Sequence, residues 1–200
     1  MTSNSRAYYA IVSRLKGAGL PFQSVIPGEQ RGDCDLIITT SEESWPFGER
    51  VVALESLSED LEVFKGQVLS RLTMGCETML IGVDPGLRIG VAVFYGEAPL
   101  AFNTLWSVGT LRSRVWEFVR AIPARKAVVR VGTGNLELAL KIARALNDEV
   151  PEAVVEMVDE AGTSARGSKM KGLQGDQSAA AKIAFRKGVL FSFDGPRNQR

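Results

Sequence analysis

The sequence predicts an α/β protein with a mixed five-stranded sheet flanked by helices, preceded by a small α/β domain. The first observation is an apolar run, the turn Asp84-Pro85-Gly86 and a second apolar run, which together indicate two antiparallel strands. The second is that segments with strand-like and helix-like patterns alternate from there to residue 187. The third is length, because 200 residues can bury one good core and a small second one.

Residues 1–75 are expected to form the small domain, and they contain no motif that we can tie to a chemistry. The expected elements are a helix over 6–17, strands near 22–26, over 35–39 and over 50–54, and a helix over 58–72. Ser58 is the expected N-cap of the second helix. Met74-Gly75 indicates a linker, so the second domain is expected over 76–200.

The second domain is expected to follow the order β-β-β-α-β-α-β-α. The expected elements are strands over 79–84, 88–95 and 100–107, a helix over 110–122, a strand over 127–131, a helix ending near 149, a strand over 153–158 and a helix over 175–187. Pro123 ends the first of these helices, because proline cannot continue one. Asn135 is the expected N-cap of the second helix.

Composition excludes several chemistries. The chain has no histidine, which rules out a Ser-His-Asp triad and an imidazole base. Two cysteines without histidine cannot build a zinc site of the usual kind. Any metal chemistry must therefore use oxygen ligands, which suit Mg²⁺ or Mn²⁺.

Location and partners are expected to be those of a cytoplasmic protein. No apolar run reaches the ~18 to 20 residues of a membrane helix, and the first residues do not resemble a signal peptide. Cys34 and Cys76 make no disulfide framework, which favours a reducing compartment. From 163 to 200 the chain has eight Lys and Arg residues and two acids, a balance compatible with a polyanionic partner or with a solvated surface.

Three positions are candidates for a carboxylate site. Asp84 ends the first apolar strand of the second domain, Asp159 and Glu160 follow the strand over 153–158, and Asp176 lies in the first turn of the last helix. Hydrolysis of phosphodiesters with two metal ions needs several carboxylates at one place. Alternation along a strand indicates that one of Asp159 and Glu160 faces that place. Purely structural roles remain open, as a turn residue, loop acids and a helix-terminal charge.

Two tryptophans also have alternative roles. Trp106 and Trp116 are expected to fill the core, and the alternative is that they stack on nucleic-acid bases.

Three motifs carry a resemblance to a known family. They are Ile81-Gly-Val-Asp84-Pro-Gly86-Leu-Arg88-Ile-Gly90, then Val158-Asp159-Glu160-Ala-Gly-Thr163-Ser164-Ala165, then Lys171-Gly172-Leu-Gln-Gly-Asp176-Gln-Ser-Ala179-Ala180. In this order they are similar to motifs of the ribonuclease H-like superfamily, in particular of RuvC-type Holliday-junction resolvases and the YqgF family. The resemblance covers residues 79 to about 190.

The resemblance implies a ribonuclease H-like fold and a metal-dependent endonuclease. Asp84, Glu160 and Asp176 would hold Mg²⁺ or Mn²⁺, and Asp159 is a further catalytic candidate. The residues expected to contact nucleic acid are Arg88, Arg166, Lys169, Lys171, Thr163 and Ser164. The implied substrate is branched DNA or structured RNA such as a ribosomal-RNA precursor. Cutting two strands of a branch would favour a homodimer.

One departure from the family pattern narrows the resemblance. RuvC-type enzymes have a glutamate on the strand that corresponds to 127–131, where this chain has Arg130. Because of that difference, the chain resembles the YqgF family more than the RuvC-type enzymes. The alternatives are a nucleic-acid-binding relative with weak catalysis, an actin-like nucleotide-binding phosphotransfer protein, and a scaffold in which the first domain recognises the partner.

Overall fold

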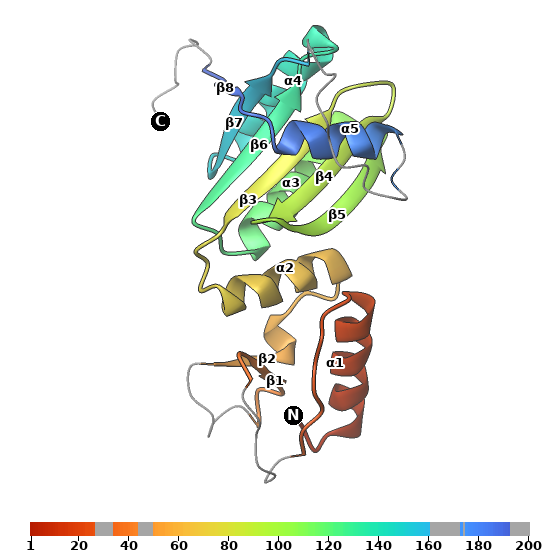
Figure 1. The fold of residues 1–200 in the computed structure, drawn as a ribbon, viewed down its shortest axis with the longest axis vertical. Helices are drawn as coiled ribbons and strands as arrows, with labels where there is room; N and C mark the ends of the chain where they lie inside the picture. The colour runs from red at the N-terminus through yellow and green to blue at the C-terminus, as the bar shows by residue number, and fades with distance from the viewer. Residues whose placement is uncertain (27–33, 44–49, 161–172, 174, 193–200) are drawn as a thin grey trace. The chain divides into compact units, whose positions relative to one another are not determined.

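The computed structural model describes residues 1–26, 34–43, 50–160, 173 and 175–192 (Figure 1). By its internal contacts the chain divides into two compact units. The first is Met1–Cys76 with Ala121–Pro123, and the second is Glu77–Arg120 with Ala124–Arg200.

The first unit is a small α/β domain. Its elements are α1 (Ser5–Gly17), β1 (Ile37–Thr39), β2 (Val51–Ala53), the 3₁₀ turn η1 (Leu54–Ser56) and α2 (Leu61–Leu72). β1 and β2 pair in parallel. Their side chains meet those of α1 and α2 in a core that includes Ile11, Leu15, Ile38, Val52, Phe64 and Val68.

Two expectations for this unit were wrong. Residues 22–26 form no strand, since the two-stranded sheet described here consists of β1 and β2 alone. The N-cap of α2 is Asp60, whose carboxylate accepts hydrogen bonds from the backbone N–H groups of Glu62 and Val63. Ser58 accepts instead from the backbone N–H of Asp60 at 3.2 Å.

The second unit is built on a mixed sheet. Its elements are β3 (Thr78–Asp84), β4 (Ile89–Tyr95), β5 (Ala98–Leu105), α3 (Val108–Ala121), β6 (Lys126–Gly132), α4 (Leu136–Glu149), β7 (Ala153–Val158), α5 (Gly175–Ala184) and β8 (Val189–Leu190). The strand order is β5-β4-β3-β6-β7-β8. β3, β6 and β7 run in parallel, and the other neighbours are antiparallel. The expected α/β class and element order are confirmed.

The sheet has six strands where five were expected. The extra strand, β8, pairs with Glu156 and Met157 of β7. At two residues it is too short for an alternating pattern to be read from sequence. The last helix ends at Ala184 and not near 187.

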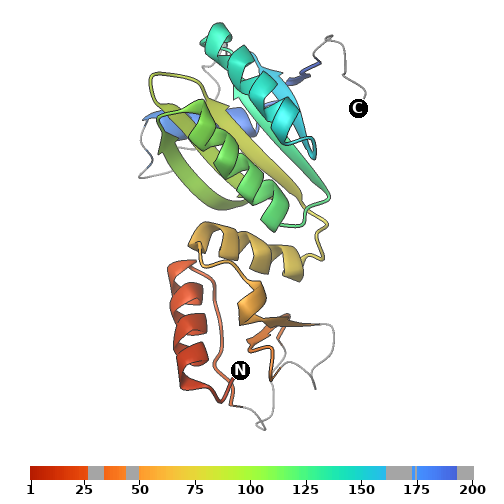
Figure 2. The same ribbon diagram turned by 180° about the vertical axis from the view of Figure 1, so that it is seen from behind.

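Helices cover both faces of the sheet, with α5 on one face and α3 and α4 on the other (Figures 1 and 2). On the α5 face, Ala92 and Phe94 pack against Ala180 and Ala184. The other helices contribute a buried stripe at helical spacing that includes Leu111, Val115, Phe118, Ile142 and Leu146. Asn135 caps α4 as expected, since its side chain accepts from the Leu138 N–H.

The α5 helix lies unusually close to the sheet, because two glycines face it. A Cβ atom placed on Gly82 would lie 2.7 Å from the Ala184 nitrogen. A Cβ atom placed on Gly90 would lie 2.6 Å from the Asp176 carbonyl carbon. Neither gap admits a side chain, so the two glycines set the distance between helix and strands.

The two tryptophans do not fill the core as expected. Trp106 is 78% exposed and Trp116 is 48% exposed. Trp116 falls outside the buried α3 stripe of Leu111, Val115 and Phe118, and Trp106 lies in the connection that follows β5. No helix in the described ranges has the length and apolar character needed to span a membrane.

Candidate functional site

Asp84 lies at the carboxyl end of β3, an interior strand between β4 and β6. It pairs with Gly90, the glycine against which the start of α5 packs. Burial, as the largest cause, and the charges of Glu160 and Asp176 together raise the pKa of Asp84 to about 6. The structure therefore brings three of the predicted acids into one electrostatic environment.

Glu160 reaches this place across the end of β6. Its carboxylate accepts a hydrogen bond from the backbone N–H of Gly134 at 2.9 Å. A Cβ atom on Gly132 would lie 3.0 Å from the Glu160 carboxyl carbon and 2.7 Å from Ile183. Gly132 ends β6, which lies between β3 and β7. A side chain at Gly132 would fill the space that the Glu160 carboxylate occupies.

Asp176 reaches the site from the first turn of α5. One of its carboxylate oxygens, Oδ2, is buried and accepts no hydrogen bond from the residues that the structure describes. The Arg88 Nε lies 3.1 Å from this oxygen but is not aligned for a hydrogen bond. The Arg88 guanidinium is the cation that faces this oxygen, and the charge of Asp176 also acts on Asp84.

The donor set suits a hard cation in kind, since all three side chains offer carboxylate oxygens. In the geometry described, however, no three Asp, Glu or Cys side chains lie close enough to one another to hold a metal ion together. Asp176 is turned to Arg88 and Glu160 to the Gly134 N–H.

The other predicted site residues fall into two groups. Asp159 is exposed, and its backbone carbonyl accepts from Arg186 at 3.2 Å, while Arg88 joins the site through Asp176. Five predicted contacts to nucleic acid lie outside the described residues: Thr163, Ser164, Arg166, Lys169 and Lys171.

Arg130 has a structural role on β6. It lies between Gly82 of β3 and Glu156 of β7 in the sheet register. Its Nε donates to Glu156 at 2.9 Å, and its Nη1 donates to the Ala184 carbonyl at the end of α5 at 2.6 Å. Arg130 thus fastens α5, the helix that presents Asp176.

We expect Arg130→Met to lower the free energy of unfolding by about 2 to 3 kcal/mol. Both charged side chains are only 17% exposed, so removing one leaves the Glu156 carboxylate poorly solvated and unpaired. The double variant Arg130→Met with Glu156→Met is expected to lose less than the single one. Urea denaturation of the three proteins measures this, and a double variant less stable than Arg130→Met would contradict it.

The site also depends on glycines to which the sequence analysis assigned no role in positioning the acids. Four glycines have such a role. Gly82 and Gly90 leave room for α5, and Gly132 leaves room for Glu160. Gly134 donates a hydrogen bond to Glu160 through its backbone N–H. A glycine inside an apolar strand signals a close approach of another group. That signal was present at Gly82 and Gly90, within the strand motif.

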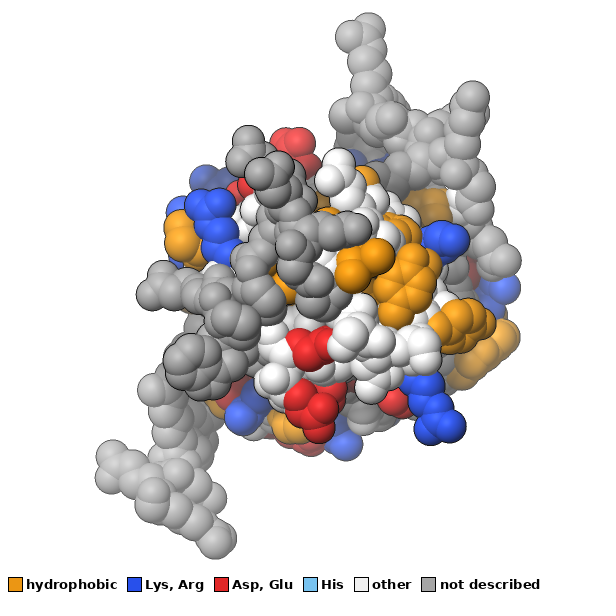
Figure 3. Space-filling model, turned by 90° about the horizontal axis from the view of Figure 1, so that it is seen from below, with side chains coloured by type: hydrophobic (Ala, Val, Ile, Leu, Met, Phe, Trp, Pro, Cys, Tyr) orange, Lys and Arg blue, Asp and Glu red, His pale blue; other side chains and the backbone are white. Residues whose placement is uncertain are grey.

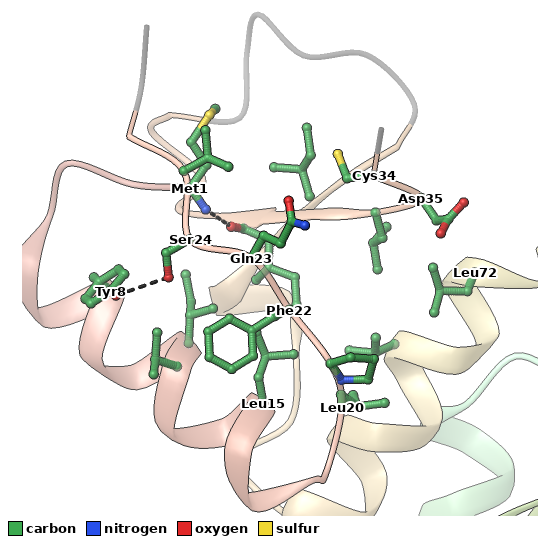
Figure 4. Close-up of a pocket in the computed structure, with 18 residues that line it drawn as sticks. Met1, Tyr8, Leu15, Leu20, Phe22, Gln23, Ser24, Cys34, Asp35 and Leu72 are labelled. Atoms are coloured by element: carbon green, nitrogen blue, oxygen red, sulfur yellow. Dashed lines mark hydrogen bonds between the residues drawn. The ribbon is translucent and has the colours of Figure 1, made fainter. Parts of the chain in front are cut away.

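Away from these acids, the first unit contains a cavity. It is a mostly apolar cavity of about 500 Å³, with Leu15, Leu20 and Phe22 among its lining residues and Cys34 and Asp35 at its rim (Figure 4). Figure 3 shows hydrophobic side chains on the face that it presents. The exposed hydrophobic side chains of the first unit include Tyr8, Tyr9, Phe22 and Ile26. Neither feature gathers the charged groups of a catalytic site.

Comparison with known proteins assigns no family. No model of a known protein family matches the chain, and no curated protein is significantly similar to it.

Proposed function

We propose that this protein is a divalent-metal-dependent endonuclease with a ribonuclease H-like fold, related to the RuvC and YqgF groups. The observation that carries the proposal is the placement of three acids around the end of β3: Asp84 pairs with Gly90, Asp176 packs against Gly90, and Glu160 packs against Gly132. The raised pKa of Asp84, caused by burial and by Glu160 and Asp176, supports it. Groups with perturbed pKa values cluster at functional sites. The strand order β5-β4-β3-β6-β7, with an acid ending β3, supports the fold assignment.

The residues proposed to hold Mg²⁺ or Mn²⁺ are Asp84, Glu160 and Asp176. Such a cation supplies charge stabilisation at a phosphate and a more acidic bound water. The chain itself contributes a rigid strand end for Asp84, a backbone N–H that orients Glu160, and a helix start that holds Asp176 against Gly90. The Arg88 guanidinium, beside Asp176 and half exposed, is placed to bind a phosphate of the substrate.

A second candidate is a nucleic-acid-binding relative without turnover. One observation favours it: in the described geometry no three acidic side chains are close enough to hold one cation. The two candidates differ in what a cation does. For an endonuclease the cation starts cleavage, and for a binding protein it leaves the nucleic acid intact.

A cleavage assay separates the two candidates. The full chain is mixed with branched DNA, linear duplex DNA and structured RNA, each with Mg²⁺, with Mn²⁺ or with EDTA. We expect cleavage of at least one branched or structured substrate that requires the cation. Intact substrates under all of these conditions would rule out the endonuclease and leave the binding protein.

Two neighbouring acids provide a matched test of the site. Glu160→Gln is expected to lower cleavage by about a hundredfold or more, because it removes a charge next to Asp84. Asp159→Asn, one residue earlier and exposed, is expected to change the rate by less than about threefold. Initial rates of the two variants measure this. Equal losses, or a larger loss for Asp159→Asn, would mean that the wrong acid has been assigned.

A further inference from the structure

An open groove lies on the face of the sheet opposite α5. It is near the end of the sheet at which β3 finishes with Asp84. It has a volume of about 570 Å³. Gly86 and Leu87 of the β3–β4 turn, Trp106 before α3, and side chains of α3 and α4 line it. α3 and α4 both begin at the end of the sheet where this turn lies (Figure 2). The turn that follows Asp84 is therefore a wall of the groove.

The groove presents large apolar side chains to solvent. Trp106 is 78% exposed and Leu87 is fully exposed. An indole face that is open to solvent offers a stacking surface for a planar ring. In nucleic acids that ring is available where bases are unpaired, and stacking on aromatic side chains tolerates every base.

The charges around Trp106 are those that suit a polyanion. The charged side chains lining the groove are Arg112 and Lys141, with no acid among the lining residues. Arg112 donates to Glu149 at 2.6 Å, while Lys141 is exposed. A neighbouring hollow along α4 shares Leu138 and Lys141 with the groove and adds Arg144 and Glu137. The side chains that line the two hollows carry three positive charges and one negative charge, and the Glu149 carboxylate that pairs with Arg112 adds a second negative charge beside them.

We propose that this groove binds single-stranded nucleic acid, with a base stacked on Trp106 and the backbone passing Lys141. This inference rests on the proposed function, because it identifies the kind of nucleic-acid strand that would approach Asp84. A strand crossing the β3–β4 turn would place a phosphate near Asp84 while its bases contact Leu87 and Trp106. The preferred substrate is then a single-stranded segment or a junction with unpaired bases, and not a continuous duplex.

The test is binding without cleavage. A fluorescent oligothymidylate of about 16 nucleotides and a blunt duplex of equal length are titrated with the full chain in EDTA. The wild type is expected to bind the single strand more tightly than the duplex, with quenching of tryptophan fluorescence. Trp106→Ala is expected to weaken binding of the single strand about tenfold, and Trp106→Phe to restore most of it.

Two controls sharpen this test. Trp116→Ala removes a half-exposed tryptophan that lies on α3 outside the groove, and it is expected to leave binding within about twofold. Lys141→Ala is expected to reduce the slope of log affinity against log salt by about 0.7, the value for one phosphate contact to a single strand. Thermal melting of each variant shows whether it is folded.

The possible outcomes are distinct. The proposal is overturned if the wild type binds neither oligonucleotide, if it prefers the duplex, or if Trp106→Ala and Trp116→Ala have equal effects. Since no divalent cation is present, none of these results depends on cleavage. If the wild type cuts nucleic acid with a divalent cation but Trp106→Ala binds the single strand as the wild type does, this inference alone is wrong. If binding depends on Trp106 but no substrate is cut, the endonuclease proposal alone is wrong.

Discussion

Asp84→Asn is expected to lower cation-dependent cleavage by about a thousandfold while making the folded protein more stable near neutral pH. The loss follows from removing the central charge of the proposed cation site, which is worth several kcal/mol in such enzymes. The substitution keeps the shape of the side chain at the end of β3, so the fold is expected to persist. Single-turnover cleavage and urea denaturation of the same preparation measure the two effects.

The gain in stability follows from the pKa of Asp84. Because burial and the charges of Glu160 and Asp176 raise that pKa to about 6, the folded state binds its proton more tightly than the unfolded state does. Stability therefore falls as pH rises from about 4 to about 6, and the penalty persists above that range. Asparagine escapes the penalty, so the variant is expected to be more stable by about 1 kcal/mol near pH 7, after allowance for solvent screening.

The difference between the two proteins is itself dependent on pH. Near pH 4 the Asp84 carboxyl is protonated in the folded state and about half protonated in the unfolded state, so the stability difference between wild type and Asp84→Asn is expected to be much smaller than at pH 7. Wild type that cuts no faster than Asp84→Asn would show that Asp84 is not in the site. Unfolding free energies that differ equally at pH 4 and pH 7 would contradict the raised pKa.

Gly90→Ala is expected to destabilise the protein by about 3 kcal/mol or more and to reduce cleavage with it. A methyl group at this position would lie 2.6 Å from the Asp176 carbonyl carbon, so α5 has to move away from the sheet. Overpacking of this kind typically costs about 1 to 3 kcal/mol, and a clash with backbone lies at the upper end. The movement also displaces Asp176 from Asp84.

The matched control is Gly175→Ala, next to Asp176 in the same helix. A Cβ atom there would meet no atom of the described residues within 4 Å, and alanine favours helix over glycine by about 1 kcal/mol. This variant is expected to be as stable as the wild type or slightly more stable. Urea midpoints compare the two, and equal losses of stability would mean that the close approach at Gly90 does not hold α5 in place.

The fold was largely predictable where pattern and chemistry agree. The strand pair around Asp84-Pro85-Gly86, the strand over 153–158 and the Asn135 cap follow from alternation and from side-chain capping, which are local properties. β8 and residues 22–26 were misread because pairing depends on the rest of the sheet. Ser58 was predicted as the N-cap where Asp60 is the N-cap, because both residue types can accept hydrogen bonds from the backbone N–H groups at the start of a helix.

The sequence indicated which acids lie near one another and not how their carboxylates are turned, and their role as a site stays a prediction. Asp84, Glu160 and Asp176 could be chosen from their positions at element ends, and all three contribute to one electrostatic environment. Sequence patterns do not show which way a carboxylate turns, so the contacts of Asp176 with Arg88 and of Glu160 with Gly134 had to come from the structure. The exposure of Trp106 likewise depends on how the connection before α3 runs.

The most direct test of the central claim is a calorimetric titration of the full chain with Mn²⁺, without nucleic acid. The account predicts saturable binding by the wild type that Asp84→Asn abolishes and that Asp159→Asn retains. Binding is also expected to release protons near pH 6, because a cation favours the ionised form of Asp84. Equal Mn²⁺ binding by wild type and Asp84→Asn, or no binding by the wild type, would contradict the account.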